Sequence, residues 1–354
     1  MLLDRNLNGG YGATRIIASV TTQTTHLVLN HNRLGNGGAR MLFHLLGKSE
    51  AKIEEIQLNS CSIGDEGMRW MIPYLRGNTT LETLYLNGNE FDGDPTIVSE
   101  FVAALNTSAL RNLSLSTNSF LSDPFLTHFL PSLSAPYLRS LHMSMIGLTS
   151  ASLPLLLDFL ASQPAKHLDL LTLNANSLSY AGVQEIISCV EQRVTGLQVL
   201  ELDGNTVEGE EESTQGAKRW SNRLKGALLR NSMLRAQVRA AALRTLRHAR
   251  ILLNARPRSH SAVPPLLSIP TELRLLVLRH SGDPLSSLSD SQFARVCDYA
   301  TTWESQARRQ GPRFPHGNKG KIRWLESVGC MYYEREPGTR KAQGVPERVE
   351  LVGY

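Results

Sequence analysis

LETLYLNGNEF, residues 81–91, determines the architecture of this 354-residue chain, because variants of it occur seven times. The other copies are THLVLNHNRL from Thr25, IEEIQLNSCSI from Ile53, LRNLSLSTNSF from Leu110, LRSLHMSMIGL from Leu138, LDLLTLNANSL from Leu168 and LQVLELDGNTV from Leu197. Their central aliphatic residues lie 28 to 30 positions apart, at Leu27, Ile56, Leu84, Leu113, Leu141, Leu171 and Leu200. A fixed period of this length indicates stacked structural repeats.

Each copy combines two periodicities. Leu84 and Leu86 alternate with polar neighbours, as in a strand with one buried face, and the residues that follow have the apolar spacing of a helix. One strand and one helix cannot bury these leucines alone, so neighbouring units must share a core. The ninth position is Asn in five copies and Cys61 in another. We expect these side chains to turn inward and bond loop backbone, in a row that breaks at Ile146 of the fifth copy.

The spelling L-x-x-L-x-L-x-x-N, with a helical stretch between copies, resembles the ribonuclease-inhibitor type of leucine-rich repeat over about residues 1–215. The resemblance implies an α/β horseshoe solenoid of about seven repeats plus a partial N-terminal one, followed here by a mostly helical basic C-terminal region. Strands pack more closely than helices, so the strands line the concave face. Residues 3–20 read as the end of a repeat and its helix, so we expect an upstream domain or a partner at that edge.

Charge divides the chain. Residues 1–212 carry 12 Lys and Arg against 22 Asp and Glu, a net charge of −10, whereas residues 213–354 carry 25 against 10, a net charge of +15. Such asymmetry bears on association rather than on fold. We expect the solenoid over residues 1–215, a basic amphipathic helix that acts as a cap over 216–256, a helical region over 257–310, and a basic, partly disordered tail over 311–354 with a strand-like run at 321–333.

The basic helix has two interpretations. No acidic residue occurs between Ser213 and Thr271, and Trp220, Leu224 and Leu228 begin a series of apolar residues at near-helical spacing. The helix is expected to cover the apolar edge of the last repeat, attracted by the acidic solenoid. The alternative is that residues 218–258 offer a basic surface to an acidic partner, to nucleic acid or to membrane headgroups.

Searches for catalytic, cofactor-binding and metal sites find no complete motif. The four cysteines lack a CxxC spacing, a glycine-rich phosphate motif fails at Arg15, and the calcium-loop spelling that begins at Asp92 and Asp94 has no Glu at its twelfth place. No apolar run is long enough for a transmembrane segment and no secretory signal is evident. We therefore expect a non-enzymatic protein of the cytoplasm, with the nucleus as an alternative.

The outward positions of the strands define the expected binding surface. They are polar, small and mildly acidic, and large anchor side chains are scarce, with Tyr85 and His142 the best candidates. We predict a scaffold that binds a protein partner on this concave face. The residues assigned to partner binding are Gln57, Tyr85, Asn87, Ser114, His142, Thr172, Glu201 and Asp203.

Two other functions remain open. Residues 269–303, with Pro270, Leu278, Cys297 and Trp303, resemble an F-box, which implies a ubiquitin-ligase substrate adaptor, although a plain helical hairpin also fits. Ran-type GTPase activators belong to the same repeat family, and Arg33 or Arg15 would supply the arginine in that case. The sequence does not determine the oligomeric state.

Overall fold

The computed structural model describes residues 8–205, 214–254, 269–281, 287–302, 305, 314 and 317–334. The chain divides into two compact units, Met1–Leu228 and Leu229–Tyr354. Within the described ranges, no helix combines the length and the apolarity needed to cross a membrane.

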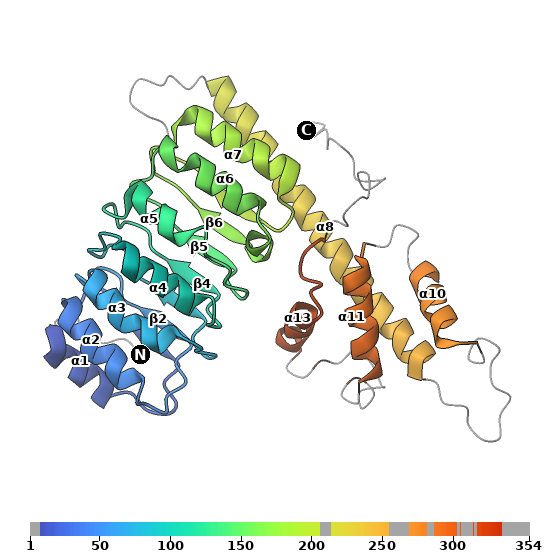
Figure 1. The fold of residues 1–354 in the computed structure, drawn as a ribbon, viewed down its shortest axis with the longest axis horizontal. Coiled ribbons are helices and arrows are strands. Elements are labelled where there is room, and N and C mark those ends of the chain that lie inside the picture. The colour runs from blue at the N-terminus through green and yellow to red at the C-terminus, as the bar shows by residue number, and fades with distance from the viewer. Residues whose placement is uncertain are drawn as a thin grey trace. The chain divides into compact units, whose positions relative to one another are not determined.

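The first unit is built on one parallel sheet whose seven strands follow chain order (Figure 1). The strands are β1 (His26–Val28), β2 (Glu55–Gln57), β3 (Thr83–Tyr85), β4 (Asn112–Ser114), β5 (Ser140–His142), β6 (Leu170–Thr172) and β7 (Val199–Glu201). The central aliphatic residue of each copy pairs with that of the next, beginning with Leu27 opposite Ile56 and Ile56 opposite Leu84. The repeat register predicted from the sequence is therefore confirmed.

Helices alternate with these strands and cover one side of the sheet (Figure 1). They are α1 (Gly9–Ala18), α2 (Gly35–Leu46), α3 (Asp65–Leu75), α4 (Pro95–Leu105), α5 (Ser122–Phe129), α6 (Leu153–Ala161) and α7 (Ser179–Arg193), with short 3₁₀ turns η1 (Ser150–Ser152) and η2 (Pro164–His167). Helix α1 precedes the first strand, as the predicted partial N-terminal repeat requires. The unit is thus a leucine-rich-repeat solenoid.

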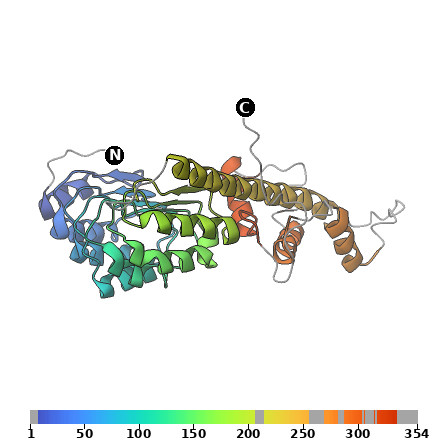
Figure 2. The same cartoon turned by 90° about the horizontal axis from the view of Figure 1, so that it is seen from above.

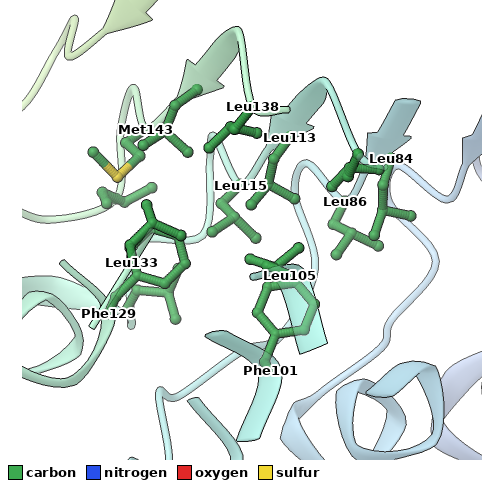
Figure 3. Close-up of a cluster of buried hydrophobic side chains, with 14 of the residues drawn as sticks. Leu84, Leu86, Phe101, Leu105, Leu113, Leu115, Phe129, Leu133, Leu138 and Met143 are labelled. Atoms are coloured by element: carbon green, nitrogen blue, oxygen red, sulfur yellow. The ribbon is translucent and has the colours of Figure 1, made fainter. Parts of the chain in front are cut away.

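One apolar core runs through the stack. Figure 3 shows the inward leucines of the third and fourth copies, Leu84, Leu86, Leu113 and Leu115, facing side chains of the helical layer. Phe101 and Leu105 of α4 and Phe129 of α5 are fully buried there. Each buried aliphatic or aromatic side chain stabilises the fold by about 1.5–3 kcal/mol, so the stability of a repeat depends on its neighbours.

The ninth-position asparagines form the expected inward row. The Asn89 amide donates to the carbonyls of Leu58 (2.8 Å) and Leu86 (2.9 Å), and its oxygen accepts the backbone N–H groups of Cys61 (3.0 Å) and Ile63 (3.1 Å). One side chain therefore bonds two neighbouring repeats. Four more ninth-position asparagines are buried and donate to the carbonyl of the leucine that directly follows the strand of their own copy: Asn32, Asn118, Asn176 and Asn205.

The two exceptional ninth positions behave differently. Cys61 is buried and its thiol donates weakly to the Leu29 carbonyl (3.2 Å), while burial raises its pKa to about 11. Cys61 is therefore a structural thiol. Ile146 is buried and has no polar side-chain atom, so the amide row is interrupted there as predicted. Its backbone N–H is still bonded, to the oxygen of Asn176 at 3.1 Å.

A single helix of 41 residues, α8 (Thr214–Asn254), follows the last repeat and confirms the predicted basic helix. Within the first unit, Leu224 and Ala227 of α8 are buried in the solenoid core. The guanidinium of Arg223 donates to both carboxylate oxygens of Glu191 on α7, at 3.0 and 2.5 Å, and also to the hydroxyl of Ser188 (3.1 Å). The start of α8 therefore covers the apolar edge of the last repeat.

The second unit is a helical cluster formed by the rest of α8 with α10 (Thr271–Ser281), α11 (Asp290–Thr301) and α13 (Asn318–Ser327). Trp324 of α13 is buried, 5.3 Å from the ring of Phe314 and 5.7 Å from that of Tyr299. The predicted strand-like run at 321–333 is wrong, because Trp324, Leu325 and Val328 are buried with helical spacing. Residues 335–354, assigned to the tail, lie outside the described residues.

Candidate protein-binding surface

The eight residues assigned to partner binding lie on strands of one sheet or directly after them, but their exposure differs. Glu201 and Asp203, at the last strand, are exposed, and Gln57, Tyr85, Asn87 and His142 are half-buried. Ser114 and Thr172 are only 5% and 6% exposed, contrary to the expected open positions. Neighbouring strands lie about 4.8 Å apart, so larger side chains on either side cover these short ones.

A row of polar side chains follows each strand and fixes the spacing of the repeats. The side-chain oxygen of Asn30 accepts the backbone N–H of Asn59, and the oxygen of Asn59 accepts that of Asn87, each at 2.9 Å. The pattern recurs where Asn174 accepts the N–H of Asp203 (2.9 Å). The signal in the sequence is a small polar residue two places before the ninth position in every copy.

Side chains on this face also bond to one another. Gln57 accepts from Asn30 (2.8 Å) and donates to Glu55 (2.5 Å), and Ser114 donates to Asn87 (2.5 Å). The Asn30–Gln57 and Asn87–Ser114 bonds join neighbouring repeats, and the Gln57–Glu55 bond lies within β2. All three orient polar groups before any partner arrives, so less side-chain entropy is lost on binding.

The last three strands contain a second network. Thr172 lies within hydrogen-bond distance of Ser144 (3.1 Å) and of His142 Nδ1 (3.3 Å), and Asn174 donates to Glu201 (2.7 Å). Burial lowers the pKa of His142, while the negative charge of Glu201 acts in the opposite direction. His142 is therefore mostly neutral at pH 7 and can accept as well as donate a hydrogen bond.

The charges of the outward strand positions have one sign. Glu55, Glu201 and Asp203 are acidic, and none of the strand positions facing outward between His26 and Asp203 is Lys or Arg. Glu55 lies 3.8 Å from His26 of the neighbouring strand, while Glu201 and Asp203 remain exposed. A complementary partner surface would be neutral or basic near β7.

An exposed apolar pair was missed by the sequence analysis. Phe120 was aligned with the inward aliphatic position of the fourth copy, but it is 69% exposed, and Leu121 is buried in its place. Met145, in the next loop, is 50% exposed. The two loops stack closely, because Ser122 donates to the Ile146 carbonyl at 2.8 Å. The sequence signal was the adjacent pair Phe120-Leu121, of which only one residue can face inward.

Acidic side chains at the starts of the helices have structural roles. Asp94 caps α4 by accepting from Thr96 (2.9 Å) and Ile97 (3.0 Å), and its own N–H donates to Asp65 at 2.6 Å. These contacts account for Asp94 of the incomplete calcium-loop spelling. Among the described residues, no group of three or more His, Cys, Asp or Glu side chains is arranged to hold a metal ion.

Comparisons with known proteins agree with this geometry. The leucine-rich repeat family model matches residues 25–43, 51–69 and 77–94. The ribonuclease inhibitor of Mus musculus is 28% identical over 189 residues, a match that covers 45% of this chain and 41% of the inhibitor. The chain thus spans less than half of that relative's length.

Two solved structures are also similar to this chain. Actin-binding site 2 of leiomodin-1 gives a TM-score of 0.37 at 16% identity and covers 51% of this chain and 95% of its own. The C-terminal domain of tropomodulin from Caenorhabditis elegans gives a TM-score of 0.24 at 16% identity and covers 63% and 93%.

Proposed function

We propose that this chain, a ribonuclease-inhibitor-like leucine-rich repeat protein, is a non-enzymatic scaffold that holds a protein partner against the outward face of its sheet. The observation that carries the proposal is the row of outward polar side chains, which cross-strand hydrogen bonds orient in advance. A surface ordered in this way fits recognition of a folded partner better than chemistry on a small substrate, which needs an enclosed pocket.

The partner's contact region is proposed to extend from Tyr85 and His142 to the acidic end at β7. Glu201 and Asp203 would face basic groups of the partner. Phe120 and Met145 add exposed apolar area to the rim, and an aromatic residue is a frequent source of binding energy.

A reducing compartment, the cytoplasm or the nucleus, is part of the proposal. None of the four cysteines is paired in a disulfide. Burial raises the pKa of Cys61 and Cys297 to about 11 and that of Cys330 to about 12, so these thiols are poor nucleophiles and suit structural roles.

Affinity purification of the full chain with quantitative mass spectrometry tests the proposal. The Glu201→Lys/Asp203→Lys variant should lose its specific partner by tenfold or more, because two attractive charges become repulsive. The matched control is Glu100→Lys/Glu185→Lys, which makes the same charge change at exposed positions of α4 and α7. Equal recovery of all specific proteins by both variants would overturn the concave-face assignment.

A further inference from the structure

The part of α8 that belongs to the second unit has two opposite faces. Val238, Ala242, Leu246 and Ala249 are at most 2% exposed and form the core together with residues of α10, α11 and α13. Figures 1 and 2 show these three helices beside the C-terminal half of α8. The buried face explains how α8 holds the second unit together.

The other face presents a mixed apolar and basic stripe. The α8 stripe consists of Leu229, Met233, Ala236, Ala240, Arg244, Arg247 and Ile251, all of which are exposed. Successive spacings of four, three, four, four, three and four residues keep all seven within one sector of the helix and extend the stripe over about 33 Å. Leu229, Met233 and Ile251 are 45%, 48% and 61% exposed, so apolar area remains at both ends.

The stripe also carries positive charge, from Arg244 and Arg247, on a helix without acidic residues. Residues 214–254 contain no Asp or Glu. Several arginines beside the stripe bond within the unit: Arg230 to Asn231 (2.7 Å), Arg239 to the sulfur of Met331 (3.5 Å) and Arg250 to Ser305 (2.9 Å). Arg244 and Arg247 differ from these, because no hydrogen bond or ion pair to a described residue is found for either guanidinium.

We propose that the α8 stripe is a docking site for an acidic amphipathic helix of a partner protein, separate from the concave face. The alanines at its centre let a second helix approach closely, at an interaxial distance of about 8–10 Å. Leu229 and Met233 at one end and Ile251 at the other would contact the apolar face of that helix. Arg244 and Arg247 would pair with its carboxylates through two parallel hydrogen bonds each.

The composition of the stripe favours this occupant over others. Nucleic acid would place phosphates against Leu229, Met233 and Ile251, and these apolar side chains contribute no binding energy in contact with a phosphate. A membrane surface would favour bulky apolar residues where Ala236 and Ala240 stand. A second copy of α8 would offer no Asp or Glu to pair with Arg244 and Arg247, whether it ran parallel or antiparallel.

Fluorescence anisotropy of the full-length protein with a designed peptide tests the proposal. The probe is a fluorescein-labelled 24-residue helical peptide with Leu on one face and Glu on both flanks, and its scrambled sequence is the reference. Wild-type protein should bind the helical probe but not the scrambled one. Arg244→Glu/Arg247→Glu should weaken binding about tenfold, and a Lys-flanked probe should restore affinity for that variant.

The matched control is Arg219→Glu/Lys225→Glu, which makes the same charge change at exposed α8 residues outside the stripe and should bind as the wild type does. Ala240→Trp should also weaken binding, since it blocks close approach without changing charge. Circular dichroism melting verifies that each variant folds. The proposal is overturned if the helical probe does not bind, if the scrambled probe binds equally, or if only phosphatidylserine vesicles or duplex DNA bind through Arg244 and Arg247. A dimer in sedimentation that Ala240→Trp disrupts would also overturn it.

Discussion

At the level of single residues, the solenoid is held by side chains that bond across repeats. Asn89 reaches carbonyls of two repeats, and Asp123 joins the fourth repeat to the fifth, where the row of amides is interrupted at Ile146. The Asp123 carboxylate accepts from the N–H of Thr149 at 2.8 Å, from its hydroxyl at 2.6 Å, and from the hydroxyl of Ser152. These bonds connect α5 to the loop that precedes α6.

Asp123 should make stability depend on pH in the acid range. Burial alone would raise the pKa of Asp123, but hydrogen bonds from Ser152 and Thr149 to the charged form hold its pKa below the ordinary value of 3.8. A depressed folded-state pKa gives stability that is complete above the unfolded pKa and is lost as pH falls through the folded pKa. Asp123→Asn should therefore lower the free energy of unfolding at pH 7, and the difference from wild type should shrink in acid.

Urea unfolding of wild type and Asp123→Asn from neutral to acidic pH measures this difference. Asp92→Asn, at a neighbouring exposed position, is the control and should follow the wild type. A difference between wild type and Asp123→Asn that stays constant down to the lowest pH would show that the charge of Asp123 contributes nothing.

At the level of elements, the first turns of α8 close the stack. A repeat at the end of a solenoid exposes apolar area that needs a cover. Leu224 and Ala227 supply the apolar contact, and Arg223 adds two hydrogen bonds to the carboxylate of Glu191. Side-chain hydrogen bonding to Glu191 raises the pKa of Arg223.

The ion pair between Arg223 and Glu191 should contribute modestly to stability. Their side chains are 37% and 29% exposed, so solvent screens the pair and we expect a coupling of about 0.5–1 kcal/mol. A double-mutant cycle of Arg223→Ala and Glu191→Ala in urea unfolding measures it, and the coupling should fall at about 1 M salt. No measurable coupling at low salt would mean that only the apolar contacts attach α8.

At the scale of strands and helices, the sequence predicts some features of the structure and not others. Strand register followed from the leucines, because a strand with one buried face repeats every two residues and slipping by one would expose them. Periodicity did not resolve Phe120 from Leu121, since both are apolar and only the loop conformation selects which one turns inward. Periodicity also predicted a strand-like run at 321–333, whereas the structure has a helix up to Ser327, which packing of Trp324 against Phe314 and Tyr299 stabilises.

The exposure of the residues assigned to the binding surface was also only partly predictable from the sequence. Six of the eight assigned residues lie on strands, and Asn87 and Asp203 lie shortly after them. The burial of Ser114 and Thr172 depends on the size of neighbours one repeat away, which the pattern within one copy does not give. The hydrogen-bonded row from Asn30 to Asp203 could have been found in the sequence, because small polar residues recur at the same place in every copy.

At the level of the whole molecule, an acidic solenoid and a basic helical unit share one continuous helix, α8. The first unit offers the outward face of its sheet, and the second offers the α8 stripe. The two surfaces have opposite charge, so they would recruit different partners, and the corresponding charge reversals test them independently.

Hydrogen exchange of the full chain tests most directly whether the repeats and the start of α8 form one capped stack. The backbone N–H groups of Leu58, Leu86, Leu115 and Met143 each donate to the next strand at 2.8–2.9 Å, and that of Leu173 donates to β7 at 2.9 Å. We predict strong protection of all five, together with the helical amides of Leu224 and Ala227. Exchange of Leu173 and Leu224 at the rate of an unfolded peptide, while Leu86 stays protected, would contradict the capped stack.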